Sequence, residues 1–142
     1  QMLRADALFA LGADNPARYA TALEIYRAVS FGGKLGVDEK IVVSFKIARV
    51  LEKLKRVNEA IDLYYSQVVL AYRDARLSGL RLSEAARTAF SRAAFRLADE
   101  YESRGKDRQA TRILRLVVES DVPAADEAAK RIQKLSNKGK ML

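Results

Sequence analysis

A spaced pattern of hydrophobic residues occurs twice in this chain, at a separation of fifty positions. Each copy reads large, small, large, a turn, small and large, with identical internal spacing. The first copy is Ile47, Ala48, Leu51, Lys55, Ala60 and Tyr64, and the second is Leu97, Ala98, Tyr101, Gly105, Ala110 and Leu114. A shorter copy lies upstream at Tyr19, Ala22, Tyr26 and Val29. Repetition on this scale predicts stacked helical hairpins, an architecture that presents an extended binding surface.

The composition limits both the fold class and the chemistry. The chain has 142 residues, of which 49% are hydrophobic, so it is long enough for one domain with a continuous core. It contains no cysteine and no histidine, which removes disulfides, thiolate nucleophiles, imidazole bases and most zinc, haem and copper sites. We therefore expect no enzymatic activity, no catalytic residues, no metal site and no cofactor. The absence of cysteine does not fix the cellular compartment.

Charge and hydropathy bear on the partners. The formal net charge is +8, which favours acidic partners. No segment reaches the ~18 uninterrupted apolar residues that a membrane span requires, so no membrane span is expected. The sequence starts at Gln1 and enters a helical pattern almost at once, and we interpret it as a fragment of a longer protein.

Hydrophobic periodicity and helix-end residues predict seven helices and no strand. The expected helices cover approximately 2–11, 16–30, 39–54, 57–76, 84–103, 107–119 and 124–136. Asn15 and Asp38 are the expected N-caps of the second and third helices, and Gly12 is the expected C-cap of the first. The three glycines within 32–36 form an inter-hairpin loop, because a phosphate-binding loop would need a preceding strand and a Gly-Lys-Ser/Thr ending. These boundaries predict one domain over 1–136, with units at about 1–33, 37–80 and 82–120, a capping helix at 122–136 and a flexible tail at 137–142.

The repeated positions resemble the tetratricopeptide repeat, a helix–turn–helix unit of about 34 residues. The third unit matches best, through Leu97, Ala98, Tyr101, Gly105, Ala110, Leu114 and Pro123. The resemblance implies an all-α, right-handed α-solenoid of about three such units followed by a C-terminal capping helix. The family's tryptophan is absent, since Ser44 and Ala94 occupy its position. The fifty-residue interval is also roughly sixteen residues longer than the family norm. If two helices share that excess, each extends by ~12 Å as a projecting arm.

A first candidate site lies on the side of two helices away from their hydrophobic stripes. At 100° per residue, Phe45 lies about 160° and Phe95 about 140° from the centre of its own stripe. Tetratricopeptide proteins line a concave groove with the first helix of each unit, so the resemblance places both rings there. The predicted partner-binding residues are Phe45, Arg49, Arg92, Phe95, Arg96 and Asp99. The alternative is that adjacent helices cover both rings as ordinary core.

A second candidate is electrostatic. Six arginines fall between 73 and 96, a stretch with only Asp74 and Glu84 as acids. Its first four, Arg73, Arg76, Arg81 and Arg87, would form a basic arm for a phosphate backbone or an acidic protein surface. The alternative is a solvated basic face, because these arginines fall on several sides of their helices.

The sequence therefore predicts a non-catalytic protein–protein interaction or scaffolding module that binds a peptide or partner helix in a concave groove. Two alternatives remain. One is the binding of nucleic acid or an acidic surface by the basic arm. The other is homo-oligomerisation through the exposed first repeat.

Overall fold

The computed structural model describes residues 1–140, and every regular element among them is a helix. The elements are α1 (Met2–Leu11), α2 (Ala17–Phe31), α3 (Val37–Lys53), α4 (Val57–Leu63), η1 (Tyr64–Leu70), α5 (Ala71–Leu77), α6 (Glu84–Ser103), α7 (Asp107–Glu119) and α8 (Ala125–Lys140). Because α4, η1 and α5 follow one another without a break, residues 1–140 form seven continuous helices. The predicted all-α class is confirmed.

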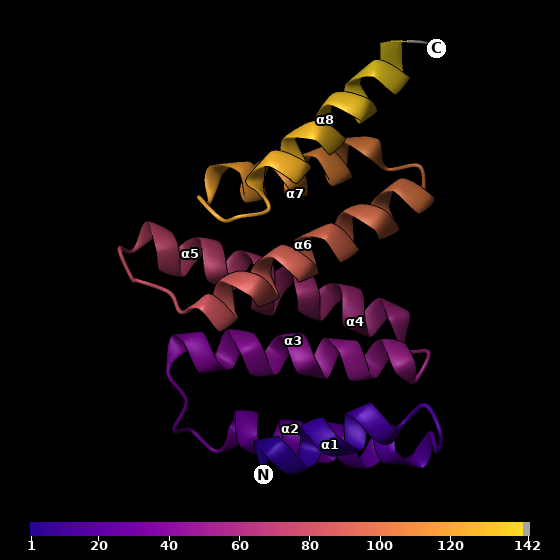
Figure 1. Cartoon of the computed structure of the whole chain (residues 1–142), viewed down its shortest axis with the longest axis vertical. Helices are drawn as coiled ribbons and strands as arrows, with labels where there is room; N and C mark the ends of the chain where they lie inside the picture. Colours follow the sequence, from indigo (N-terminus) through magenta and orange to yellow (C-terminus); the bar gives the residue numbers. More distant parts are fainter. Residues whose placement is uncertain (141–142) are drawn as a thin grey trace.

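The helices are stacked along the long axis of the molecule, with the N-terminus at one end and α8 at the other (Figure 1). Each helix packs against the next one in the chain, and α3 also packs against α6 and η1. In Figure 1, α1, α6 and α8 lie in front of α2, α4–α5 and α7. A single hydrophobic cluster runs through the stack from Ala5 in α1 to Leu135 in α8. This arrangement leaves long helix faces available as surfaces.

Two turns fifty residues apart have the same backbone geometry. Lys55, between α3 and α4, has φ = 64°, and Gly105, between α6 and α7, has φ = 73°. Both turns close with the long hydrogen bond of a Schellman motif. The bonds run from Arg56 N to Leu51 O (2.9 Å) and from Lys106 N to Tyr101 O (2.7 Å). The sequence repeat around Lys55 and Gly105 is thus a repeat of backbone conformation.

This equivalence gives a stability prediction. The left-handed conformation costs a non-glycine residue about 1–2 kcal/mol, so Lys55→Gly should raise the free energy of unfolding by about 0.5–1 kcal/mol after the greater chain entropy of glycine is counted. Gly105→Ala should lower it by about 1 kcal/mol for a conformational reason alone, since an added Cβ would meet no atom within 4 Å. Urea unfolding measures both changes. Lys53→Gly, within α3, is the matched control and should lower the free energy of unfolding by about 1 kcal/mol. Destabilisation by Lys55→Gly would contradict the assigned turn.

The long helix over residues 57–77 carries part of the extra length between the two copies of the pattern. It consists of three seven-residue segments, whereas α7 at the equivalent place has 13 residues. Its middle segment, η1, is a π-helix, and the adjacent Val68 and Val69 are both fully buried in it. η1 packs against both α3 and α6, which accounts for its wide apolar surface. The tip of α5 extends past the ends of α3 and α7 (Figure 1).

The predicted N-cap of α3 is wrong. α3 begins after Gly36, whose backbone N–H donates to Glu39 Oε1 at 3.5 Å, so Asp38 lies in the first turn. The Asp38 carboxylate instead accepts a hydrogen bond from the Ser83 backbone N–H at 3.2 Å, which joins the starts of α3 and α6. Gly12 is the C-cap of α1, as predicted, and its φ of −65° is right-handed. A Cβ at Gly12 would clash with the Tyr19 ring, and close packing therefore requires glycine there.

The C-terminal boundary also differs from the prediction. α8 continues to Lys140, so the first four residues of the predicted tail at 137–142 are helical. Residues 141–142 lie outside the described part of the chain. Polar residues such as those at 136–140 are compatible with a helix whose outer side faces water. Polarity alone therefore placed the C-terminal end of α8 too early.

Candidate partner-binding surface

Arginine side chains lie over phenylalanine rings at three successive steps of the stack. Each ring belongs to one helix and each guanidinium to the next helix of the series α1, α3, α6 and α8. The distances from guanidinium carbon to ring centroid are 4.7 Å for Arg49 over Phe9, 5.7 Å for Arg92 over Phe45 and 5.7 Å for Arg131 over Phe95. All three lie within the ~6 Å range of cation–π attraction. We call the surface formed by these six side chains the ladder face.

Ion pairs repeat along the same four helices. An acid on one helix pairs with a cation on the next: Asp6 with Lys46 at 3.0 Å, Glu52 with Arg96 at 2.5 Å, and Asp99 with Arg131 at 2.8 Å. Glu102 also pairs with Arg131. Glu52 and Glu102 are fifty residues apart and each lies seven residues after its phenylalanine. The sequence repeat therefore extends to the polar contacts that join adjacent helices.

A cavity of about 420 Å³ opens on the ladder face between α3 and α6. Its lining consists of Phe45, Arg49, Glu52, Lys53, Lys55, Tyr64, Arg92 and Arg96. A smaller cavity of about 290 Å³ lies between α1 and α3 and shares Arg49 with the first. Among residues 1–140, neither Arg49 nor Arg92 forms an ion pair. Cations exceed acids in the larger cavity, which favours an acidic occupant.

Phe45 is not the exposed anchor that the sequence predicted. Its side chain is only 8% exposed and belongs to the hydrophobic core. Arg49 and Arg92 lie over the ring, and Tyr64 packs beside it with ring centroids 5.8 Å apart. The alternative of a covered ring is the correct one here. Phe45 forms the floor of the cavity, and a partner would meet the two guanidinium groups above it.

The other predicted residues fall in two places. Arg96 lines the cavity but is held internally, since it pairs with Glu52 and also with Glu100 at 3.1 Å. Phe95 and Asp99 do not line the cavity. Phe95 is half-buried and packs against the core beneath Arg131 of α8. Asp99 is the exposed partner of the same Arg131.

Hydrogen bonds fix the protonation of the groups beneath the cavity. Burial, together with the hydrogen bond that Tyr64 Oη donates to Glu52 Oε2 at 2.8 Å, raises the pKa of Tyr64 far above its usual value. Tyr64 therefore remains a donor at neutral pH. Burial alone would raise the pKa of Glu100, but its bonds to Arg96 and Arg104 outweigh this and hold that pKa below its usual value. Glu100, next to the cavity, is thus ionised at neutral pH and already engaged.

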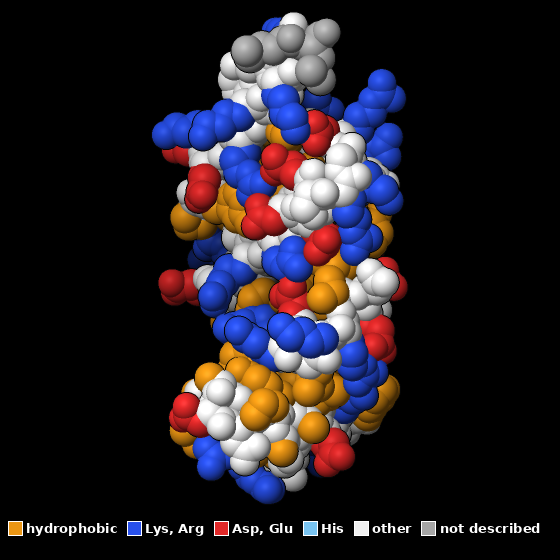
Figure 2. All heavy atoms as spheres, turned by 90° about the vertical axis from the view of Figure 1, so that its right-hand side faces the viewer, with side chains coloured by type: hydrophobic (Ala, Val, Ile, Leu, Met, Phe, Trp, Pro, Cys, Tyr) orange, Lys and Arg blue, Asp and Glu red, His pale blue; other side chains and the backbone are white. Residues whose placement is uncertain are grey.

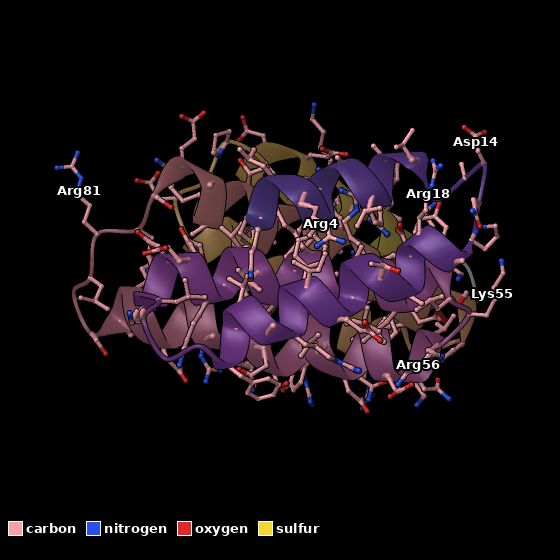
Figure 3. The ribbon with its side chains drawn as sticks, turned by 90° about the horizontal axis from the view of Figure 1, so that it is seen from below. Arg4, Asp14, Arg18, Lys55, Arg56 and Arg81 are labelled. Atoms are coloured by element: carbon pink, nitrogen blue, oxygen red, sulfur yellow. The ribbon has the colours of Figure 1, made fainter. Side chains whose placement is uncertain are left out.

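The four residues of the predicted basic arm have different surroundings. Arg73 pairs with the neighbouring Asp74 at 2.9 Å. Arg87 instead donates to the backbone oxygen of Asp121 at 3.4 Å, in the connection between α7 and α8. Arg76 is half-buried. Figure 3 shows Arg81 pointing away from the body of the molecule. Arg73 and Arg87 are thus engaged within the chain, which leaves fewer free cations for a phosphate backbone.

Sequence reasoning missed a basic stripe on α7. Arg108, Arg112 and Arg115 are exposed and follow at i, i+4 and i+7, which places them on one side of the helix. None of the three forms an ion pair within the described residues. The spacing of these arginines can be read directly from the sequence.

Hydrophobic side chains are exposed at the N-terminal end of the stack. Leu3 and Phe31 are each 85% exposed, on α1 and α2. Figure 2 shows hydrophobic side chains gathered at the lower end of the face that lies on the right of Figure 1, while acidic and basic groups intermingle above them. This region corresponds to the exposed first repeat named as a self-association surface.

None of the helices described between residues 1 and 140 is both long enough and apolar enough to cross a membrane. No family model, no curated protein and no solved structure matched this chain.

Proposed function

We propose that this chain is a non-catalytic helical-repeat module that binds an acidic segment of a partner protein along the ladder face. The helices would form a right-handed solenoid of about three tetratricopeptide-like units capped by α8. The equivalent turns at Lys55 and Gly105 support this assignment, as do the repeated contacts of Glu52 and Glu102. Repeat arrays use such continuous faces to bind extended peptides or helices.

The observation that carries the proposal is the unequal charge of the larger cavity. Arg49, Lys53, Lys55, Arg92 and Arg96 contribute five cations, and Glu52 is the sole acid of the lining. Glu52 is already paired with Arg96. The remaining cations have no acidic partner on this face within residues 1–140, so an acidic segment would supply the missing charges.

Stacking on phenylalanine would prepare Arg49 and Arg92 for this role. A guanidinium that lies over a ring keeps its N–H donors in its own plane, where they can meet a carboxylate in bidentate geometry. The ring also limits the rotamers of the arginine before a partner arrives. Binding would therefore lose less side-chain entropy than it would with free surface arginines.

A peptide of aspartate, glutamate, alanine and glycine, labelled with fluorescein, tests the proposal by fluorescence anisotropy. The acidic peptide should bind, and its affinity should fall as salt is added. A control peptide with lysine in place of every acid should not bind. Equal affinity for both peptides, or no binding of the acidic one at low salt, would overturn the proposal.

Each alternative function has its own readout. A labelled oligonucleotide that binds more tightly than the acidic peptide would favour nucleic acid, although the contacts of Arg73 with Asp74 and of Arg87 with Asp121 argue against it. Light scattering after size exclusion tests self-association through the exposed Leu3 and Phe31. A dimer that separates after Leu3→Ser and Phe31→Ser would support that alternative.

A further inference from the structure

A second hollow, of about 530 Å³, lies between η1, α5, α6 and α7 and shares no residue with the ladder cavities. We call it the outer hollow. Its apolar part comes from Leu70, Ile113 and Leu116, with the rings of Tyr65 and Tyr101 beside them. Tyr65 is 40% exposed, and Tyr101 is half-buried. The hollow is thus a place where a large apolar side chain could be taken out of water.

The π-helical segment supplies one tyrosine to each surface. Tyr64 lines the ladder cavity and is bonded to Glu52, while its neighbour Tyr65 lines the outer hollow. Consecutive residues of a helix point in different directions, so one helix can line both surfaces. π-helical turns are rare and occur frequently at functional sites.

Cations surround the apolar lining. Arg73, Arg112 and Arg115 belong to the lining, and Glu119 is its only acid. Arg73 already pairs with Asp74. Arg112 and Arg115 belong to the α7 stripe, in which like charges at helical spacing repel one another. An acidic ligand would remove that repulsion and would gain two charge-assisted contacts.

From this juxtaposition we infer that the outer hollow binds an acidic peptide segment through one large apolar side chain, with its carboxylates on Arg112 and Arg115. This second site goes beyond the proposed function of the ladder face, because it uses different residues on different helices. A nucleic acid fits less well. Tyr101 is half-buried and offers little open ring face for a base, and Glu119 opposes a continuing phosphate backbone.

The absence of tryptophan in residues 1–142 allows a direct measurement. The probe is a short peptide of aspartate and glutamate with one central tryptophan, excited selectively and followed by its own emission. Tryptophan emission should shift to shorter wavelength on binding, since the indole leaves water for the hollow. Two substitutions together, Arg112→Glu and Arg115→Glu, should weaken binding by about tenfold or more. Tyr65→Ala should reduce the emission shift by opening the hollow to water.

The matched control reverses two charges on the ladder face, Arg49→Glu with Arg92→Glu. This control removes binding of the peptide at the ladder face, but it should leave the emission shift in place, and the affinity for the outer hollow, taken from the emission titration, should change by less than about threefold. The inference is overturned if the peptide gives no emission shift, or if only the ladder-face variant abolishes it. Loss of the shift only in the ladder-face variant would still agree with the proposed function of the ladder face. The inference would also be overturned if an oligonucleotide of equal charge displaced the tryptophan peptide while present at a lower concentration than the peptide. Circular dichroism checks that each variant is folded.

Discussion

Replacing Phe45 by alanine is expected to lower the free energy of unfolding by about 3–5 kcal/mol, the usual cost of removing a buried phenylalanine ring. The ring is 8% exposed and packs against Tyr64, with Arg49 and Arg92 above it. Its loss would leave a cavity and would also remove the surface on which two guanidinium groups lie. Chemical denaturation followed by circular dichroism measures the change.

Phe31→Ala is the matched control, because it makes the same chemical change on a ring that is 85% exposed. It should alter the free energy of unfolding by no more than about 0.5 kcal/mol. Similar losses from both substitutions would contradict the assignment of Phe45 to the core. The comparison also shows why truncation of Phe45 is a poor test of binding: a variant destabilised this strongly loses its partner for reasons unrelated to contact.

Reversing the charges of Arg49 and Arg92 together is expected to lower the affinity for the acidic peptide by about 100-fold. Each reversal replaces an attraction by a repulsion, a change worth roughly 1.4 kcal/mol or more. The fold should survive with reduced stability, because exposed Arg92 contributes about 0.5–1 kcal/mol and half-buried Arg49 about 2 kcal/mol through their stacked contacts. Anisotropy titrations of the double Arg→Glu variant measure the loss. Thermal unfolding monitors its stability.

A second double variant separates local contact from overall charge. Arg4→Glu with Arg18→Glu changes the net charge equally, but these residues lie on α1 and α2 (Figure 3) and line none of the three cavities above. Affinity should fall by less than about threefold, through long-range attraction alone. If this variant lowers the affinity for the acidic peptide as much as the ladder-face variant does, binding depends on net charge and the ladder face is not the site.

The sequence was a good guide to the helices because helix period and turn residues are local properties. The fifty-residue repeat predicted the turn at Gly105 and its partner at Lys55, and both have the same backbone geometry. The π-helical η1 was not predictable, because its apolar residues also fit an ordinary broad stripe.

The candidate site was harder to predict because burial depends on neighbouring helices. Helical geometry assigned Phe45 an angle relative to its own stripe, and it could not show that Tyr64 and Arg92 close over the ring. Arg96 was named as a partner-binding residue, but a sequence does not reveal that Glu52 and Glu100 already hold it. Four of the six predicted residues, Phe45, Arg49, Arg92 and Arg96, line the cavity, and their roles are divided between support and exposure.

The central claim is that an acidic segment binds on the ladder face between α3 and α6. Paramagnetic relaxation tests it directly: a nitroxide attached to the acidic peptide broadens the amide signals of whichever residues it approaches. The proposal predicts that the strongest broadening falls in α3 and α6 around Arg49 and Arg92, with the α1–α2 connection little affected. Broadening centred instead on the first repeat, or spread evenly over the surface, would contradict the proposal.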